Sequence, residues 1–365
     1  MSKEFKLTYR DNWYRTAFFN KPEYIMGGMG VRTDGWDKHG VKLNDLYQKY
    51  YSHRPYADDK IPHPDPKLID EKDNYHHKWT DEWGCVMEER VYGIHPMIVC
   101  HPFESWDAWN NYQPPPGPDM ASEGIETEKK QIEESRKNGG VIIHHFLRVF
   151  ERMQWIRGYA NLFFDFAEDS KEMYKLADMV VDYNMSWIKR SIAVGVDGIG
   201  FSDDWGTQNA LMIKPEQWRK IFKPLYKRMF DPIKEAGMMV HFHSDGYIID
   251  IIPDLRELGV DVLNLQSNCH DIEQLGKLCN DIKLCVSSDM DRQGVLSFGT
   301  PQDVKDFFHK IAYLIGSHDG GLFFSCECGS DTPLENIEAV MQVLREYHTK
   351  PLESVSKIKN TSDER

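Results

Sequence analysis

Two short clusters of residues that commonly bind metal ions follow apolar, strand-like runs in this 365-residue chain. His243-Ser244-Asp245-Gly246 follows the run 238–242, and Cys326-Glu327-Cys328-Gly329 follows the run 322–325. Imidazole, carboxylate and thiolate are the groups that hold zinc in proteins. If both runs are parallel strands that lie close together in one barrel, their ends converge, and the chain has a candidate metal site at that point.

The alternation of side chains along a strand indicates which of these groups can act together. His241, His243 and Asp245 point to one face of the first strand, and Cys326 and Cys328 share a face of the second. Functional residues of barrels gather at the C-terminal ends of the strands, so we predict His243, Asp245 and Cys326 as metal ligands. The alternative is that the histidines are hydrogen-bonded core residues and that the cysteines are small core hydrophobes.

Two adjacent acids, Asp203 and Asp204, follow another predicted strand at 198–202. We predict that they are catalytic, because carboxylates at a strand end can act as a general acid or base. The alternative is an N-cap for the following helix, since Asp is a favoured N-cap residue. Both can hold at once if one acid caps a helix and the other faces the cavity.

Amide and aromatic side chains near the same strand ends complete the predicted site. Asn264 and Gln266 alternate at the end of the predicted strand 262–265, which places both amides toward the barrel mouth. Together with Trp205, we predict them as substrate-binding residues.

Composition excludes several classes of partner. The formal net charge of −14, with no basic stripe, excludes nucleic-acid binding. We expect no membrane segment, because no apolar run approaches about 18 residues, and no signal peptide at the N-terminus. Seven scattered cysteines without a disulfide framework favour a reducing cytoplasm.

The C-terminal two-thirds alternates strand-like and helix-like segments, a pattern that is typical of βα units around a parallel sheet. The predicted strands are 24–29, 141–146, 162–166, 198–202, 238–243, 262–265, 283–287 and 322–326. The predicted helices are 170–194, 215–236, 247–258, 271–280 and 301–317. Eight such strands predict an α/β fold of the TIM (β/α)8 barrel type. A doubly wound dinucleotide fold is disfavoured, because no Gly-x-Gly-x-x-Gly follows a strand.

The N-terminal part has a different composition, dense in Trp, His and Tyr and interrupted by Pro-rich loops. We predict one TIM-barrel domain over 1–365, in which 1–140 supplies an elaborated cap and the first barrel elements. A helix at 123–137 ends the cap, 141–350 forms the main barrel, and 351–365 is a charged tail.

From residue 196 to about 347, the order of motifs resembles the uroporphyrinogen decarboxylase superfamily. The motifs are Gly195-Val196-Asp197-Gly198, Asp203-Asp204-Trp205-Gly206, His243-Ser244-Asp245-Gly246, Gly259-Val260-Asp261-Val262-Leu263, Gly299-Thr300-Pro301 and Asp331-Thr332-Pro333-Leu334-Glu335-Asn336.

Within that superfamily, the chain is more similar to the zinc- and corrinoid-dependent methyltransferases than to the decarboxylases. Those methyltransferases bind zinc through a His-x-Cys-Gly strand end and a Cys six residues before Thr-Pro. His243 matches the first ligand, and Cys326, six residues before Thr332-Pro333, matches the last. Asp245 stands where the middle Cys would be. The Arg-containing N-terminal substrate motif of the decarboxylases is absent, and residues 26–30 stand near its place.

The resemblance implies a methyltransferase that uses zinc and passes a methyl group to the Co(I) of a corrinoid (cobalamin) on a partner protein. Asp245 and the aromatic cap favour the O-demethylase type, with a small methoxylated, aromatic donor. A site with fewer thiolates is more Lewis acidic and suits an oxygen ligand. Two alternatives stay open: a metal-free decarboxylase that uses the paired aspartates, and a non-catalytic barrel that binds a corrinoid or its carrier. His241, Glu327 and Cys328 stay open as further ligands.

Overall fold

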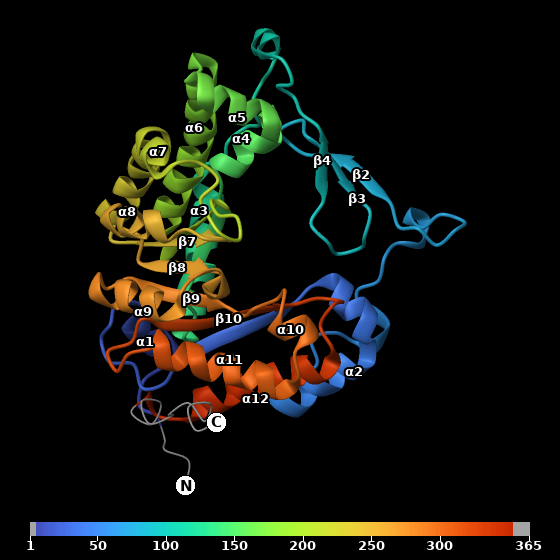
Figure 1. The fold of residues 1–365 in the computed structure, drawn as a ribbon, viewed down its shortest axis with the longest axis vertical. Coiled ribbons are helices and arrows are strands. Elements are labelled where there is room, and N and C mark those ends of the chain that lie inside the picture. Colours follow the sequence, from blue (N-terminus) through green and yellow to red (C-terminus); the bar gives the residue numbers. More distant parts are fainter. Residues whose placement is uncertain (1–4, 353–365) are drawn as a thin grey trace.

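A curled sheet of seven parallel strands forms the centre of the computed structural model, which describes residues 5–352 (Figure 1). The strand order is β1-β10-β9-β8-β7-β6-β5, and all six neighbouring pairs are parallel. The strands are β1 (Met26–Val31), β5 (Ile143–Leu147), β6 (Gly198–Ser202), β7 (Met239–Ser244), β8 (Val262–Leu265), β9 (Cys285–Asp289) and β10 (Leu322–Cys328). Within the described residues, β1 and β5 are the two ends of the sheet and do not pair with each other.

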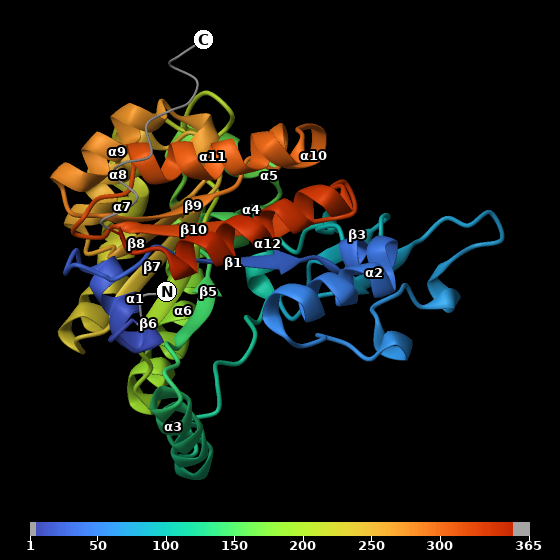
Figure 2. The ribbon, with the colours of Figure 1, turned by 90° about the horizontal axis from the view of Figure 1, so that it is seen from below.

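Helices follow most of the strands and cover the outside of the sheet (Figure 2). They are α4 (Phe150–Arg157), α5 (Tyr159–Glu168), α6 (Lys171–Val194), α7 (Pro215–Glu235), α8 (Ile252–Glu257), α9 (Ile272–Asp281), α10 (Val295–Phe298), α11 (Pro301–Leu314) and α12 (Leu334–Thr349). Short 3-10 helices precede α8 and α9, at Ile249–Ile251 and Ser267–Cys269. The predicted α/β barrel class is therefore confirmed. The core lies between the helices and the sheet, where Tyr226 and Phe230 of α7 pack on Phe242 of β7.

The prediction of eight strands is wrong, because residues 162–166 belong to helix α5. Leu162, Asp165 and Phe166 are buried, whereas Phe164 between them is 67% exposed. Burial at positions i, i+3 and i+4 is the spacing of a helix face rather than of a strand. The other seven predicted strands are present, with bounds that agree within two residues. Helix α8 starts five residues later than predicted, after the 3-10 turn.

The N-terminal part contributes β1 to the barrel and adds a small antiparallel sheet, β2 (His77–Thr80), β3 (Val86–Glu89) and β4 (Met97–Cys100). Figure 1 shows this sheet projecting from the barrel on the side of α2 (Thr33–Tyr51). The remaining elements are α1 (Tyr9–Ala17), α3 (Ser122–Lys137) and the 3-10 helices Asp58–Lys60, Pro66–Leu68 and Trp106–Asn110.

Helix α1 packs against the first residues of the barrel strands. Trp13 lies 5.0 Å from Phe323 between ring centroids, and Ala17 joins Met26, Val262 and Cys285 in one buried cluster. Of the predicted tail, 353–365 lie outside the described residues. None of the helices between residues 5 and 352 combines the length and apolar composition that a membrane crossing requires.

Candidate active site

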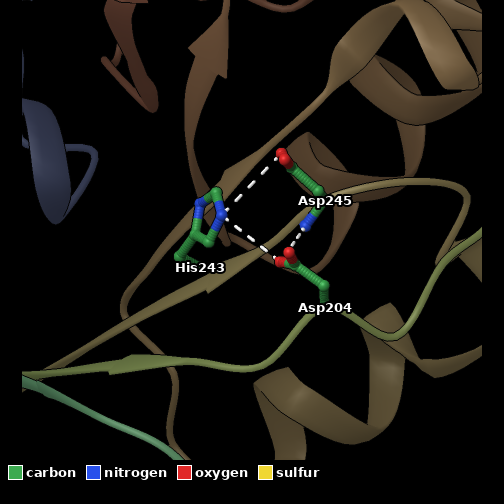
Figure 3. Close-up of side chains that lie close together, drawn as sticks. All are labelled: Asp204, His243 and Asp245. Atoms are coloured by element: carbon green, nitrogen blue, oxygen red, sulfur yellow. Dashed lines mark hydrogen bonds and ion pairs between the residues drawn. The ribbon is translucent and has the colours of Figure 1, made fainter. Parts of the chain in front are cut away.

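Three side chains at the ends of β6 and β7 form a compact cluster at the barrel mouth (Figure 3). The His243 Nε2 atom lies 3.4 Å from Asp204 Oδ1 and 3.7 Å from Asp245 Oδ1. One ligand atom of each residue lies within 4.8 Å of the other two. An imidazole nitrogen and two carboxylate oxygens at this spacing can hold a divalent cation.

Backbone contacts between the two loops set this geometry. The Asp203 N–H donates to His243 O at 3.1 Å, and the Asp245 N–H donates to Asp204 Oδ1 at 2.9 Å. The loops touch through Gly206 and Gly246, where a Cβ on either residue would collide with the backbone of the other. Gly246 also has φ +79°, a conformation that favours glycine. The glycines that end both motifs are therefore needed to bring the two aspartates to one histidine.

The ring orientation of His243 is fixed by Asn264. The Nδ1 atom of His243 lies 2.5 Å from Asn264 Oδ1, and the Asn264 amide nitrogen donates to Asp289 Oδ1 at 2.9 Å. Because that amide oxygen can only accept, Nδ1 carries a proton and Nε2 faces Asp204 and Asp245. Burial lowers the pKa of His243, but the three carboxylates of Asp204, Asp245 and Asp289 outweigh it and raise the pKa to about 9.

The two oxygens of Asp245 have different surroundings. Oδ2 accepts a hydrogen bond from Arg292 Nη2 at 2.9 Å, and Arg292 also donates to Glu327 at 3.2 Å. Oδ1 is buried and has no hydrogen-bond partner. An unpartnered buried carboxylate oxygen is costly unless a cation or proton satisfies it. The site therefore fits a zinc-type cation on Asp245 Oδ1, His243 Nε2 and Asp204.

Asp204 is a carboxylate rather than a proton donor in this arrangement. Burial raises its pKa, but the hydrogen bond and positive charge of His243 outweigh that effect, so the pKa lies below its ordinary value. Asp204 thus faces the cluster at the barrel mouth, while Asp203 turns away from it.

Asp203 points away from the cluster into the core. Its carboxylate accepts from the Val149 N–H at 2.9 Å, the Glu151 N–H at 2.8 Å and the Tyr226 hydroxyl at 2.6 Å. Asp203 therefore holds the start of α4, a helix that precedes it in the chain. The alternative from the sequence was a cap of the helix that follows Asp203. Burial raises the pKa of Asp203 to about 6. Its catalytic role stays a prediction.

Cys326 does not join the cluster of ligand atoms. Along β10, Cys326 and Cys328 share one face, and Ser325 and Glu327 occupy the other. The two thiols are buried, with their Sγ atoms 3.8 Å apart. The contact with Cys328, together with burial, raises the pKa of Cys326 well above its ordinary value, which keeps it a thiol. The prediction that Cys326 is a metal ligand stays a prediction.

The three predicted substrate-binding residues all make contacts within the protein. Asn264 holds His243, and Gln266 accepts from the Gly246 N–H at 3.1 Å. Trp205 is fully buried, donates to the Tyr226 hydroxyl at 3.0 Å and stacks on a core Phe. These contacts position the mouth loops, and substrate binding by the three residues stays a prediction.

Glu151 lies beside the aspartate pair, and no local sequence pattern singles it out. It lies on the first turn of α4, and Arg148 Nε donates to its carboxylate at 3.0 Å. Burial, with Asp204 and Asp203 adding to it, raises its pKa to about 8. At neutral pH the group is therefore mostly protonated. The contact of Arg292 with Asp245 is also not predictable from the sequence, because a single Arg in a loop belongs to no pattern of spaced residues.

A sequence profile of the uroporphyrinogen decarboxylase (URO-D) family matches residues 152–347, more than half of the chain. The chain belongs to the URO-D family. The match begins in α4 and ends in α12, so it includes Asp204, His243 and Asp245.

A solved structure agrees with the barrel fold of this URO-D protein. A methyltransferase from Methanosarcina mazei is 13% identical, with a TM-score of 0.60 over 94% of this chain and 100% of that chain. At this identity the likeness is one of fold. The YdhT protein from Bacillus subtilis is 10% identical, with a TM-score of 0.40 over 92% of this chain and 90% of that chain. The comparison with curated proteins gives no significant match.

Proposed function

We propose that this URO-D protein is a zinc-dependent methyltransferase of the O-demethylase type. It takes the methyl group of a small methoxylated aromatic donor and passes it to the Co(I) of a corrinoid carried by a separate protein. The observation that carries the proposal is the buried, unpartnered Oδ1 of Asp245 beside His243 Nε2 and Asp204. The likeness in fold to a methyltransferase supports the same reaction class.

A zinc ion with imidazole and carboxylate donors supplies Lewis acidity toward an ether oxygen. The residues of the chain prepare that chemistry. Asn264 holds Nδ1 of His243 and leaves Nε2 free for the metal, while Asp204 and Asp245 supply negative charge. Arg292 holds the second oxygen of Asp245, which fixes the direction of the first.

The leaving oxygen also needs a proton, because an alkoxide or phenolate is a poor leaving group. The bond between the methyl carbon and the ether oxygen breaks, the methyl group bonds to cobalt, which passes from Co(I) to formal Co(III), and the oxygen takes one proton. We assign that proton to Glu151, because its backbone N–H holds Asp203, the neighbour of Asp204, and its raised pKa of about 8 favours the protonated form. Asp204, whose pKa is below its ordinary value, is unsuited to this role.

The first test is the metal content of anaerobically purified protein, wild type beside Asp245→Asn, by elemental mass spectrometry. We expect close to one zinc per chain in the wild type and loss of zinc in the variant. Metal-loaded protein should then form the phenol from a methoxyphenol when Co(I) corrinoid is present. A wild type that binds no zinc when zinc is offered would refute the proposal.

A metal-free decarboxylase is the second candidate, and the raised pKa of His243 favours it. Without a metal, this pKa of about 9 keeps His243 protonated at neutral pH, beside the carboxylates of Asp204 and Asp245. The imidazolium can protonate the carbon that loses carbon dioxide. Release of carbon dioxide from a carboxylic acid by chelator-treated protein would support this candidate over the first.

A further inference from the structure

The barrel contains an open cavity of about 390 Å³ on the amino-terminal side of the metal-ligand cluster. Residues from α1, β1, β7, β8, β9 and β10 line it. TIM-barrel interiors are normally filled by layers of bulky, branched side chains. The space is therefore a feature of this sequence rather than of the fold.

Small residues at facing positions leave the cavity open. A Cβ at Gly28 or Gly30 of β1 would meet nothing within 4 Å. Ser325 of β10 is the register partner of Gly28, and Ser287 of β9 lies on the next strand. Gly28 and Gly30 are exposed, so the cavity reaches solvent along β1.

Three polar groups in this cavity lack partners. Neither ring nitrogen of His241 makes a hydrogen bond with a described residue, and Nε2, unlike Nδ1, is not buried. The hydroxyls of Ser287 and Ser325 form no hydrogen bond with any residue between 5 and 352. An imidazole nitrogen and two hydroxyls can donate to or accept from a ligand oxygen.

The rest of the lining is aromatic or apolar. Trp13 and Phe323 form one wall, with ring centroids 5.0 Å apart, and Tyr9 lies beside them. Phe146 lies edge-on to the His241 ring at 5.8 Å. None of the described residues that line the cavity is an Asp, Glu, Lys or Arg. This combination suits a flat, uncharged molecule with one or two oxygen substituents, and it would penalise the burial of a carboxylate.

The cavity lies within reach of the cluster. His241 and His243 point to the same face of β7, two residues apart, which is about 7 Å along a strand. A substituted benzene ring spans a comparable length. A ring bound against His241 can therefore present one oxygen substituent to His243, Asp204 and Asp245.

We propose that this cavity binds the uncharged aromatic ring of the methyl donor, with a ring hydroxyl or ether oxygen on His241, Ser287 or Ser325. That the bound ring belongs to a methyl donor rests on the proposed function. The cavity narrows the substrate class to neutral methoxyphenols rather than methoxybenzoates.

The test is isothermal titration of zinc-loaded protein with 2-methoxyphenol and with 2-methoxybenzoate. Gly28→Leu fills the cavity, and position 28 has ordinary strand geometry with open space at its Cβ. Gly124→Leu on α3 is the matched control, since its Cβ would meet only the end of Arg190 at 3.9 Å. We expect at least tenfold weaker binding of 2-methoxyphenol to Gly28→Leu, no change in Gly124→Leu, and at least tenfold weaker binding of the benzoate to the wild type.

Several results would overturn the proposal: no binding of 2-methoxyphenol to the wild type, equal binding of the benzoate, or wild-type affinity in a folded Gly28→Leu. If Gly28→Leu does not fold, His241→Phe replaces it, with the same expected loss. Binding that needs Gly28 without any demethylation would refute the proposed function and still support the cavity as a ring site. Equal demethylation by wild type and Gly28→Leu would refute the cavity and leave the function standing.

Discussion

Replacement of Asn264 by Ala tests how the histidine of the cluster is positioned. Asn264 Oδ1 accepts from His243 Nδ1, and its amide nitrogen donates to Ser287 O at 2.8 Å and to Asp289 Oδ1 at 2.9 Å. The variant loses all three contacts while every metal ligand is kept. The imidazole can then rotate, and its neutral form can carry the proton on Nε2 instead of Nδ1, which competes with metal binding.

Two magnitudes follow from these contacts. Loss of a partner that orients a metal-bound His lowers metal affinity by about 10- to 100-fold. In free energy this is about 1.4 to 2.7 kcal/mol. The unpaired buried groups also lower the free energy of unfolding by about 1 to 3 kcal/mol. The second effect is present with or without zinc, so the two can be separated.

The assay is competition for zinc between the protein and a chromophoric chelator, for wild type, Asn264→Ala and Asn268→Ala. Asn268 is an exposed control whose side chain contacts Asp291 and not the cluster. Urea unfolding in excess chelator gives the metal-free stability of each protein. A folded Asn264→Ala that binds zinc within about threefold of wild type, well short of the expected loss, would show that Asn264 does not orient the ligand.

Four further substitutions have defined outcomes. Asp197→Asn removes a buried carboxylate that two arginines hold at a pKa of about 2, against an ordinary 3.8. That stabilisation is present above the ordinary pKa and is lost as the pH falls through 2. In urea titrations the free energy of unfolding of the variant should therefore be about 2 kcal/mol below wild type at pH 7, and the difference should vanish near pH 2. Asp203→Asn should cost about 1 to 2 kcal/mol in the same titration, because α4 loses its cap. Arg292→Met should weaken zinc binding about tenfold in the chelator assay, because Asp245 loses the partner that holds its second oxygen and directs the first toward the metal. Cys326→Ser tests by mass spectrometry whether Cys326 adds to the cluster: the three clustered residues alone predict that zinc is retained, and loss of zinc would support Cys326 as a further ligand.

Much of the barrel follows from local sequence patterns. The strands 198–202 and 262–265 are predicted with their observed bounds, because each is a short apolar run that polar loop residues end. The run 162–166 has the same apolar character but belongs to a helix. A run of five residues with four apolar side chains fits either period, and only the burial of Leu162 and Phe166 beside an exposed Phe164 reveals the helix.

The site is predictable to the extent that it follows strand alternation. His243 and Asp245 share a face as expected, and Asp204 joins them while Asp203 turns inward. Alternation shows that Cys326 and Cys328 share a face of β10, but not which face meets the barrel interior, because that depends on tertiary packing. Glu151 acquires its raised pKa only from burial beside Asp204, which no local pattern reveals.

The position of β1 at the end of the sheet has a consequence for how the chain folds. Within residues 5–352, the only strand that pairs with β1 is β10, from the far end of the sequence. Contacts between such distant segments form slowly, because the entropy cost of closing a long loop comes before the contacts can stabilise the fold. During synthesis, β1 leaves the ribosome long before β10 is made, so the glycine-rich strand β1 has no partner strand until then. We therefore expect the barrel to close only after β10 has been synthesised, with β1 docking as one of the last folding events.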